Sequence, residues 1–408
     1  MFSFLKKKVK FTYKKIIEVT FLFLYKKPKL RLKKKDFSEK IIDIKLDKNL
    51  YKLFEFTGGR IFTDGNDTTA YISKNNNISE ASLQYKKFDF INSKMQKFSK
   101  NEVLSKGTPK FKKKINGNLL SLLSGGAARD NFTHWFTDII PRIKIYQEKF
   151  NLKKIDKFYV PSIKYKFQRE SLSYFGINQS NVISSEKYKH IEANKIYATT
   201  HPCFHKPTMV KKWSIKYLNK IYKKRSNLKK YEKIFINRDQ FKLIDKNNLK
   251  KYSEYRVLVN ENEIKSYLTS IGFITIKPEE YSFSDQLKMF SSAKYVVGLY
   301  GAAMMMLAFC KKKTKVLEFK PIGGGMEFKN ISKLNNLKHR QIILKPLVKS
   351  RILQNGLLLC PINRIKSELK VLGLKKLQIS QRTLHPQLSY CLTYRLDGKR
   401  LRLRQLSI

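Results

Sequence analysis

A histidine and an aspartate stand four residues apart in the stretch NFTHWFTDIIPR, residues 131–142. If Asn131 caps a helix that begins there, His134 and Asp138 share one face of that helix. A carboxylate beside an imidazole orients the ring and raises its basicity, so the pair could take a proton from a reacting hydroxyl group. The same spacing is typical of a buried histidine that bonds its helical neighbour, and spacing alone leaves both interpretations open.

Two arginines in the second half of the chain are candidates for binding phosphate. Arg238 follows a predicted strand, and Arg256 leads into the pair Asn260-Glu261. Ligands of open α/β sheets bind outside the carboxyl ends of the strands, and the arginine fork suits two-point contact with phosphate oxygens. In a chain this basic, either arginine taken alone is a weak signal.

A glycine-containing turn follows the strand predicted at 295–297. Gly298 and Gly301 interrupt the sequence there, and a helix is predicted to start at Ala302. Free backbone N–H groups and the positive end of a helix meet at such a turn and can bind phosphate. Glu318 follows the next predicted strand, where a carboxylate can hold ribose hydroxyls. A tight, buried strand-to-helix turn fits the glycines equally well.

These candidates lie in two runs of alternating strands and helices, which predict an α/β architecture with parallel sheets. Before the first run, turn pairs within residues 50–86 predict a short β-meander. Strands are predicted at 119–123, 158–161, 196–198, 233–237, 273–276, 295–297 and 315–319. Helices are predicted from Asn131 and at 168–175, 213–230, 262–270, 284–292 and 302–309.

The pattern divides the chain into four predicted regions. Residues 1–40 form a basic leader, and residues 41–212 form an N-terminal α/β acceptor domain with the β-meander. Residues 213–348 form a C-terminal nucleotide-sugar-binding domain, and residues 349–408 form a tail of atypical composition. The two α/β units are expected to face a central cleft.

The chain is strongly basic, with 86 Lys and Arg against 31 Asp and Glu and a net charge of +55 over 408 residues. Such a charge favours anionic partners, including nucleic acid, acidic lipid and phosphorylated small molecules. The lysines are spread over most of the chain, so composition bias explains them as well. The basic, apolar leader could rest on an anionic membrane face, or it could be the first element of the fold.

Four widely spaced cysteines indicate neither a disulfide framework nor a zinc framework, and a reducing, cytoplasmic compartment fits them best. His201 and His205 flank Cys203 and superficially suggest a metal site, but no further ligand cluster accompanies them. The longest uncharged run, residues 295–310, is more typical of a buried strand, turn and helix than of a transmembrane helix.

Taken in order, these motifs resemble those of glycosyltransferase family 61, the capsular-polysaccharide-type family also described as DUF563. The likeness covers about residues 50–345. The matching positions are Asn131, His134, Trp135, Asp138, Pro141, Arg142, Arg238, Arg256, Asn260, Glu261, Gly272, Phe273, Ser282, Asp285, Gln286, Ala293, Gly298, Gly301, Ala302 and Glu318.

The resemblance implies a GT-B-like fold of two Rossmann-like domains and an inverting transfer of a sugar from a nucleotide-sugar donor. The acceptor would be a glycan or a lipid-linked hydroxyl in the synthesis of surface polysaccharide, at the inner face of the membrane. The nucleotide sugar is then a co-substrate, and neither a cofactor nor a divalent metal is needed. His134 is the first choice for the base and Asp138 the second. The implied donor-binding residues are Arg238, Arg256, Asn260, Glu261, Gly301, Ala302 and Glu318, and the other motif residues are Asn131, Trp135, Arg142 and Gln286.

The sequence departs from the family pattern at the glycine turn and before the histidine. The family usually has His-Gly-Ala-Gly-Leu-Thr-Asn, whereas this chain has YGAAMMM at 300–306, and Thr133 replaces the usual glycine. An inactive relative of the family is therefore one alternative. A nucleic-acid-binding protein is another, because the charge and the many aromatic residues permit it, although the clustered motifs favour the transferase.

Overall fold

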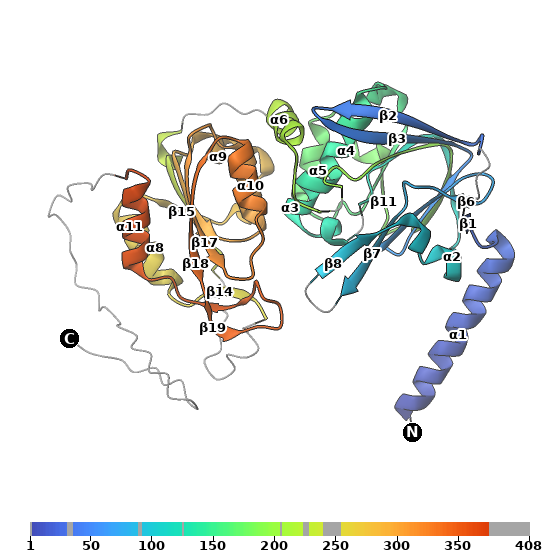
Figure 1. Ribbon diagram of the computed structural model, residues 1–408, viewed down its shortest axis with the longest axis horizontal. Helices are drawn as coiled ribbons and strands as arrows, with labels where there is room; N and C mark the ends of the chain where they lie inside the picture. Colours follow the sequence, from blue (N-terminus) through green and yellow to red (C-terminus); the bar gives the residue numbers. More distant parts are fainter. Residues whose placement is uncertain are drawn as a thin grey trace. The chain divides into compact units, whose positions relative to one another are not determined.

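The fold is described by a computed structural model that covers residues 2–30, 36–88, 92–124, 126–204, 206–222, 228–239 and 254–374. Residues Met1–Gly373 form one compact unit. It contains a twelve-stranded mixed sheet, a five-stranded sheet and a small three-stranded sheet, with helices packed against them (Figure 1). The predicted α/β class is therefore confirmed.

The first half of the large sheet is antiparallel and contains the predicted meander. Strands β2 (Glu39–Leu46) and β3 (Asn49–Thr57) form a hairpin, and β4 (Arg60–Thr63) pairs with β5 (Thr68–Ile72). Strand β5 then pairs with β7 (Leu83–Phe88), and β7 pairs with β8 (Asn92–Gln96). Two short strands, β6 (Asn77–Ile78) and β1 (Lys29–Leu30), complete this edge.

The second half of the large sheet is parallel, in the order β12-β9-β10-β11. Its strands are β9 (Lys113–Ser121), β10 (Lys157–Val160), β11 (Val182–Ser184) and β12 (His190–Thr199). The antiparallel part joins it at β12, which pairs with both β3 and β4 in one continuous register. Helices α5 (Lys166–Ser173) and α6 (Lys212–Ile221) follow β10 and β12, and α6 ends well before the predicted residue 230.

The second sheet is entirely parallel, in the order β15-β13-β16-β17-β18. Its strands are β13 (Lys233–Ile236), β15 (Ile274–Ile276), β16 (Tyr295–Leu299), β17 (Lys315–Pro321) and β18 (Lys338–Leu344). Its helices include α8 (Glu261–Ser270), α9 (Phe283–Ser292) and α10 (Glu327–Leu334). Because β15 lies on one side of β13 and β16 on the other, the strand order reverses at β13/β16, where such sheets bind ligands.

The third sheet corrects the predicted boundary at residue 348. Strand β14 (Arg256–Leu258) pairs with β20 (Gly356–Leu358), which also pairs with β19 (Pro346–Lys349). Helix α11 (Ile362–Val371) follows and contacts α8 and β18. The sequence assigned to a tail from residue 349 is therefore part of the compact unit as far as Gly373, and residues 375–408 lie outside the described residues.

One hydrophobic core contains side chains from elements near the large sheet and the five-stranded sheet. The ring of Phe136 stacks on Phe283 of α9 with centroids 4.9 Å apart, and it meets Phe309 edge-on at 5.8 Å. The run from Met304 to Met306 is completely buried in this core. That run lies in a 3₁₀-helix, η11 (Ala302–Phe309), where the sequence predicted an ordinary helix. The uncharged stretch 295–310 is thus a buried strand, turn and helix, as predicted.

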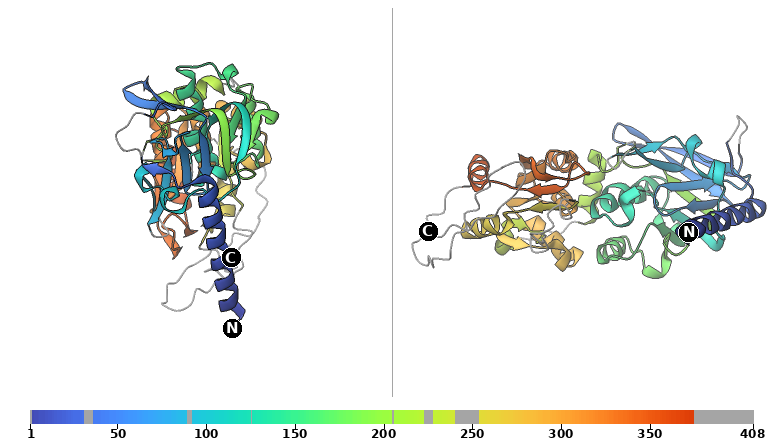
Figure 2. Two further views of the ribbon diagram at one scale, coloured as in Figure 1. Left: turned by 90° about the vertical axis from the view of Figure 1, so that its right-hand side faces the viewer. Right: turned by 90° about the horizontal axis from the view of Figure 1, so that it is seen from below.

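The predicted leader contains a long helix, α1 (Phe2–Tyr25), which extends away from the strands in Figure 1 and in the left view of Figure 2. Its last turn packs against the large sheet, since the Tyr25 ring meets His190 of β12 at 5.1 Å and the Tyr25 carbonyl accepts hydrogen bonds from Arg60 of β4. Among the described residues, no helix combines the length and apolar character that crossing a membrane requires.

Candidate active site

The motif at 131–142 forms the predicted helix. Asn131 caps it, because its side-chain oxygen accepts hydrogen bonds from the backbone N–H groups of Thr133 (2.8 Å) and His134 (3.3 Å). The helix continues through α3 (Phe132–His134), a π-helical segment η4 (Trp135–Ile139) and α4 (Ile140–Gln147). This cap fixes the first turn of the helix, from which His134 projects.

The π-helical segment has a cause in the sequence. Pro141 has no N–H group, so the carbonyl of Thr137 cannot receive the usual bond from four residues later. The thiol of Cys203 donates to that carbonyl instead, at 3.5 Å. Single π-turns of this kind are frequent at functional sites, and this one contains Asp138.

His134 and Asp138 form a close pair. The Nδ1 atom of His134 lies 2.6 Å from Oδ2 of Asp138. The carboxylate can only accept a hydrogen bond, so Nδ1 carries the proton and Nε2 keeps its lone pair. Burial would lower the pKa of His134, but the charge of Asp138 and the hydrogen bond to it, together with the charge of Glu327, raise that pKa above its ordinary value of 6.5. The imidazole is 22% exposed, whereas the carboxylate is 2% exposed.

Asp138 is held as a carboxylate by several donors. The hydroxyl of Thr137 (2.8 Å) and the backbone N–H of Thr208 (3.1 Å) donate to Oδ1. Burial disfavours the charge, but the electrostatic interactions of Asp138 with His134 and His201 and the hydrogen bonds from these rings keep its pKa well below the ordinary value. A completely buried carboxylate that stays ionised orients the imidazole, and it is not itself exposed to take a proton from an acceptor.

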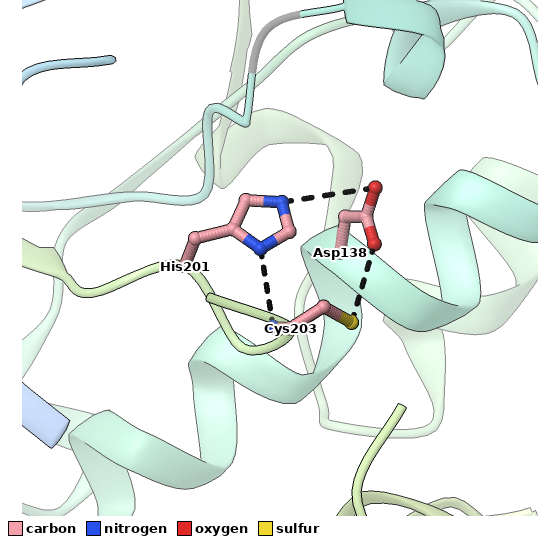
Figure 3. Close-up of side chains that lie close together, drawn as sticks. All are labelled: Asp138, His201 and Cys203. Atoms are coloured by element: carbon pink, nitrogen blue, oxygen red, sulfur yellow. Dashed lines mark hydrogen bonds and ion pairs between the residues drawn. The ribbon is translucent and has the colours of Figure 1, made fainter. Parts of the chain in front are cut away.

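His201 and Cys203 lie against the other side of Asp138 (Figure 3). Nδ1 of His201 accepts the backbone N–H of Cys203 at 3.1 Å, so its Nε2 carries the proton and points at Oδ2 of Asp138, 3.7 Å away. Burial lowers the pKa of His201, which keeps the ring neutral, and burial raises the pKa of the Cys203 thiol well above its usual range.

The three ligand atoms of Asp138, His201 and Cys203 all lie within 4.8 Å of one another, and their types would suit zinc. These atoms already have partners within the fold, however: the thiol of Cys203 lies 3.5 Å from the carbonyl of Thr137, and Oδ2 of Asp138 lies 2.6 Å from Nδ1 of His134. We therefore assign the cluster to the support of Asp138. His205, the remaining residue of the superficial metal motif, lies outside the described residues.

Two further motif residues hold the helix in place. Arg142 is completely buried; its Nε donates to the carbonyl of Asp138 (3.0 Å) and its Nη1 to the carbonyl of Thr199 on β12 (2.8 Å). The indole N–H of Trp135 donates to the hydroxyl of Ser171 on α5 at 2.8 Å. These contacts are structural, and neither side chain is exposed to a substrate.

The glycine turn lies directly beside the two predicted arginines. Strands β13 and β16 are neighbours, with Ile236 opposite Gly298, so both chains leave the sheet at the same edge. A Cβ atom added to Gly301 would lie 3.0 Å from Nη1 of Arg238 and 3.5 Å from Nη1 of Arg256. The structure therefore brings together the two arginines and the backbone at the start of η11, as the sequence predicted.

Arg256 is fixed by its neighbours in the fold. Its Nε donates to the carbonyl of Gln354 (2.7 Å), its Nη1 donates to the carbonyl of Tyr300, and its guanidinium lies over the Tyr300 ring at 4.6 Å. Burial and then the charge of Arg238 lower the pKa of Arg256 to about 10. Two neighbouring guanidinium groups favour an anion bound between them.

Tyr300 occupies the position where family members usually have histidine, and its contacts depend on Glu327. The Tyr300 hydroxyl donates to the Glu327 carboxylate and accepts the N–H of Gly325 at 3.0 Å. Burial, followed by Glu327, raises the pKa of this phenol, so it keeps its proton. Glu327 also acts electrostatically on His134 and Arg256. Sequence reasoning missed Glu327, because no motif marked it.

A direct hydrogen bond joins the histidine helix to the glycine turn. The hydroxyl of Thr133 donates to the carbonyl of Ala302 at 3.3 Å. Thr133 replaces the usual glycine, so this departure from the family pattern creates the contact. His134, the next residue, therefore lies one residue away from a hydrogen bond to the turn that Arg238 and Arg256 border.

Two further predicted donor-binding residues and the motif residue Gln286 make hydrogen bonds within the fold. Glu261 accepts the backbone N–H of Arg238 at 3.1 Å, and Asn260 bonds both backbone groups of Cys360 on the β20 side. Gln286 is buried and donates to the carbonyl of Pro278 at 2.7 Å. These three residues position the backbone of the site.

Glu318 is 1% exposed, and its Oε2 accepts hydrogen bonds from His339 (3.0 Å) and Gln341 (2.6 Å) of β18. Its partners within the fold favour a structural role, and its contact with a ribose stays a prediction.

Adding one methyl group at the turn tests the phosphate site. Gly301 has an extended backbone, with φ of 168°, so Gly301→Ala is expected to leave the melting temperature nearly unchanged. Its Cβ, 3.0 Å from Arg238, should displace the guanidinium and weaken the binding of nucleoside diphosphate by about tenfold. Calorimetric titration checks this. Gly176→Ala, at a glycine with open space around it, is the control for a general effect of alanine, although its positive φ costs some stability.

The comparison with protein families agrees with this geometry. The model of the family described as Glycosyltransferase 61 matches residues 132–317, which includes His134, both arginines and the glycine turn. A search of curated protein sequences finds no match. The family match does not favour the alternative function, a nucleic-acid-binding protein. Residues 132–317 of this chain are therefore similar to glycosyltransferase family 61, and this match supports glycosyltransferase activity.

Proposed function

We propose that this protein is an inverting, metal-independent glycosyltransferase of the GT-B type. It transfers a sugar from a nucleotide-sugar donor to a hydroxyl group of a glycan or lipid-linked acceptor in the synthesis of surface polysaccharide. The observation that carries the proposal is the hydrogen bond between Thr133 and Ala302. It holds a histidine with a free Nε2 lone pair next to a turn bordered by two guanidinium groups.

The diphosphate of the donor binds at the glycine turn in this proposal. Arg238 and Arg256 contact its oxygens, and the N–H groups at the start of η11 complete the anion site. The same groups stabilise the negative charge that grows on the leaving phosphate as its bond to the sugar breaks. Since the two guanidinium groups and the helix end supply this positive charge, the reaction needs no divalent metal.

The acceptor reacts on the opposite face of the sugar. Nε2 of His134 takes the proton of the acceptor hydroxyl while that oxygen attacks the anomeric carbon. The bond from the anomeric carbon to the phosphate oxygen breaks through an oxocarbenium-like transition state, and nucleoside diphosphate leaves. A single displacement inverts the anomeric configuration. Asp138 orients the ring and stabilises the imidazolium that forms.

The rate should depend on pH through His134. A general base works only in its neutral form, and Asp138 raises the pKa of His134, so kcat/KM should fall as the pH decreases through a value above 6.5. Replacing Asp138 with asparagine removes the negative charge, so the residual activity should have its acid limb at lower pH. A pH–rate profile of both proteins measures this. An acid limb that Asp138→Asn leaves in place would assign the titration to another group.

A donor screen tests the proposed activity. The protein is incubated with a panel of nucleotide sugars, and the release of nucleoside diphosphate is measured alongside protection from thermal unfolding by UDP, GDP and CMP. Release from at least one donor supports the proposal. Protection without release or transfer would indicate an inactive relative. Neither protection nor release, combined with tight and salt-dependent binding of random DNA, would favour a nucleic-acid-binding protein.

A further inference from the structure

Helix α1 has an exposed apolar face. Val9, Tyr13, Ile16 and Phe23 recur at intervals of four, three and seven residues, so they lie on one side of the helix. Their exposed fractions are 63%, 65%, 59% and 88%. Scattered exposed apolar residues are normal on a protein surface, but four on one side of a helix form a continuous stripe.

The other side of α1 attaches the helix to the fold. Phe21 and Tyr25 project from that side, because about 100° of rotation per residue separates Phe21 from Phe23 by roughly half a turn. The Tyr25 ring meets His190 at 5.1 Å, and the Tyr25 carbonyl accepts hydrogen bonds from Arg60 at 3.4 Å. The side chain of Leu22 lies against Gly107. The apolar stripe therefore faces away from the elements to which the helix is attached.

The charges of the helix identify its partner. Six lysines lie within Phe2–Tyr25, at positions 6, 7, 8, 10, 14 and 15, against the single acidic residue Glu18. Helical geometry places Lys10 and Lys15, whose side chains the structure describes as exposed, on the two flanks of the apolar stripe. A second copy of this chain would bring two lysine-rich helices together, which like charge opposes. An anionic lipid surface matches both features, because its acyl boundary receives the stripe and its phosphates pair with the lysines.

We propose that α1 binds the surface of an anionic membrane, with its apolar stripe in the acyl boundary and its lysines at the head groups. This location would bring the protein to lipid-linked acceptors, but the inference does not depend on the proposed reaction. The helix lies along the surface, since its lysines are strongly disfavoured in the bilayer interior.

Flotation with lipid vesicles tests the proposal on the full chain. The protein should float with vesicles of phosphatidylcholine and phosphatidylglycerol, remain unbound with phosphatidylcholine alone, and be released by high salt. The triple variant Val9→Ser, Ile16→Ser, Phe23→Ser should lose at least about tenfold in partition coefficient, because apolar area no longer enters the lipid. Phe11→Ser is the matched control, since Phe11 is also exposed, at 61%, but lies on the lysine side. Equal melting temperatures establish that both variants are folded.

Four outcomes would overturn the proposal. The first is unchanged flotation of the folded triple variant, and the second is an equal loss for Phe11→Ser. The third is a dimer in solution, measured by light scattering, that the triple variant abolishes; this would assign the stripe to a second copy of the chain. Equal binding to vesicles without phosphatidylglycerol would remove the role of the lysines and so contradict the proposal as stated.

Discussion

Replacing His134 with alanine is expected to lower kcat by about 10²- to 10⁴-fold, the range that general-base catalysis commonly contributes. The reason is that Nε2 of His134 carries the lone pair, whereas its Nδ1 is committed to Asp138 at 2.6 Å. The diphosphate site at Arg238 and Gly301 keeps all its groups in this variant. The affinity for nucleoside diphosphate should therefore change by less than about twofold.

Steady-state kinetics and a calorimetric titration on the same preparation check this prediction. Added imidazole should restore part of the activity of His134→Ala, because a free base can enter the space left by the ring. A melting temperature close to that of the unsubstituted protein excludes unfolding as the cause. If kcat falls by less than about threefold, a different group removes the acceptor proton, and our assignment of the base is wrong.

Replacing Arg256 or Arg238 with alanine is expected to weaken donor binding by about 10- to 100-fold each, since a hydrogen bond to a charged group contributes about 1.5–3 kcal/mol. Arg256→Lys should recover only part of this affinity. Lysine keeps the charge but loses the flat contact with the Tyr300 ring, 4.6 Å away, and the forked pair of donors. Because the two guanidinium groups lie beside the same turn, their effects should not be additive.

Arg340→Ala is the matched control for these substitutions. Arg340 lies on β18, is 48% exposed and pairs with Glu368 of α11 at 2.7 Å. Its replacement should leave both the affinity for nucleoside diphosphate and kcat unchanged. Equal losses for Arg340→Ala and Arg256→Ala would mean that binding follows the overall charge of the chain, and the specific anion site would have to be abandoned.

The sequence predicted those parts of the site that depend on local chemistry. Asn131 marked the helix start because its short polar side chain caps free N–H groups, and the structure has that cap. Gly301 marked the turn that follows a strand, and both predicted arginines lie beside that turn. Alternation of strands and helices likewise predicted parallel pairing, which the structure has in one half of the large sheet and throughout the five-stranded sheet.

Contacts between distant segments were not predictable in this way. His201 and Cys203 support Asp138 from a loop more than sixty residues later, and from sequence they suggested only a weak metal motif. Glu327, at the start of α10, accepts a hydrogen bond from Tyr300 and acts electrostatically on Arg256 and His134. No local sequence pattern distinguishes it from other acidic residues. The function of these residues depends on the three-dimensional packing.

Composition misled the placement of the last boundary. Strand β20 has three residues, Gly356–Leu358, which is too short for a periodic signal. It is paired with β14, about one hundred residues earlier, and this pairing orders the loop that supplies the carbonyl of Gln354 to Arg256. The segment assigned to a tail therefore helps to position Arg256.

The proposed reaction requires a base and an anion site that act on opposite faces of one sugar carbon. The anomeric configuration of the first-formed product, followed by proton NMR during transfer from the donor found in the screen, measures this arrangement. We predict a product whose anomeric configuration is opposite to that of the donor, formed as nucleoside diphosphate is released. A product that retains the donor configuration would require a second displacement and would contradict direct attack assisted by His134.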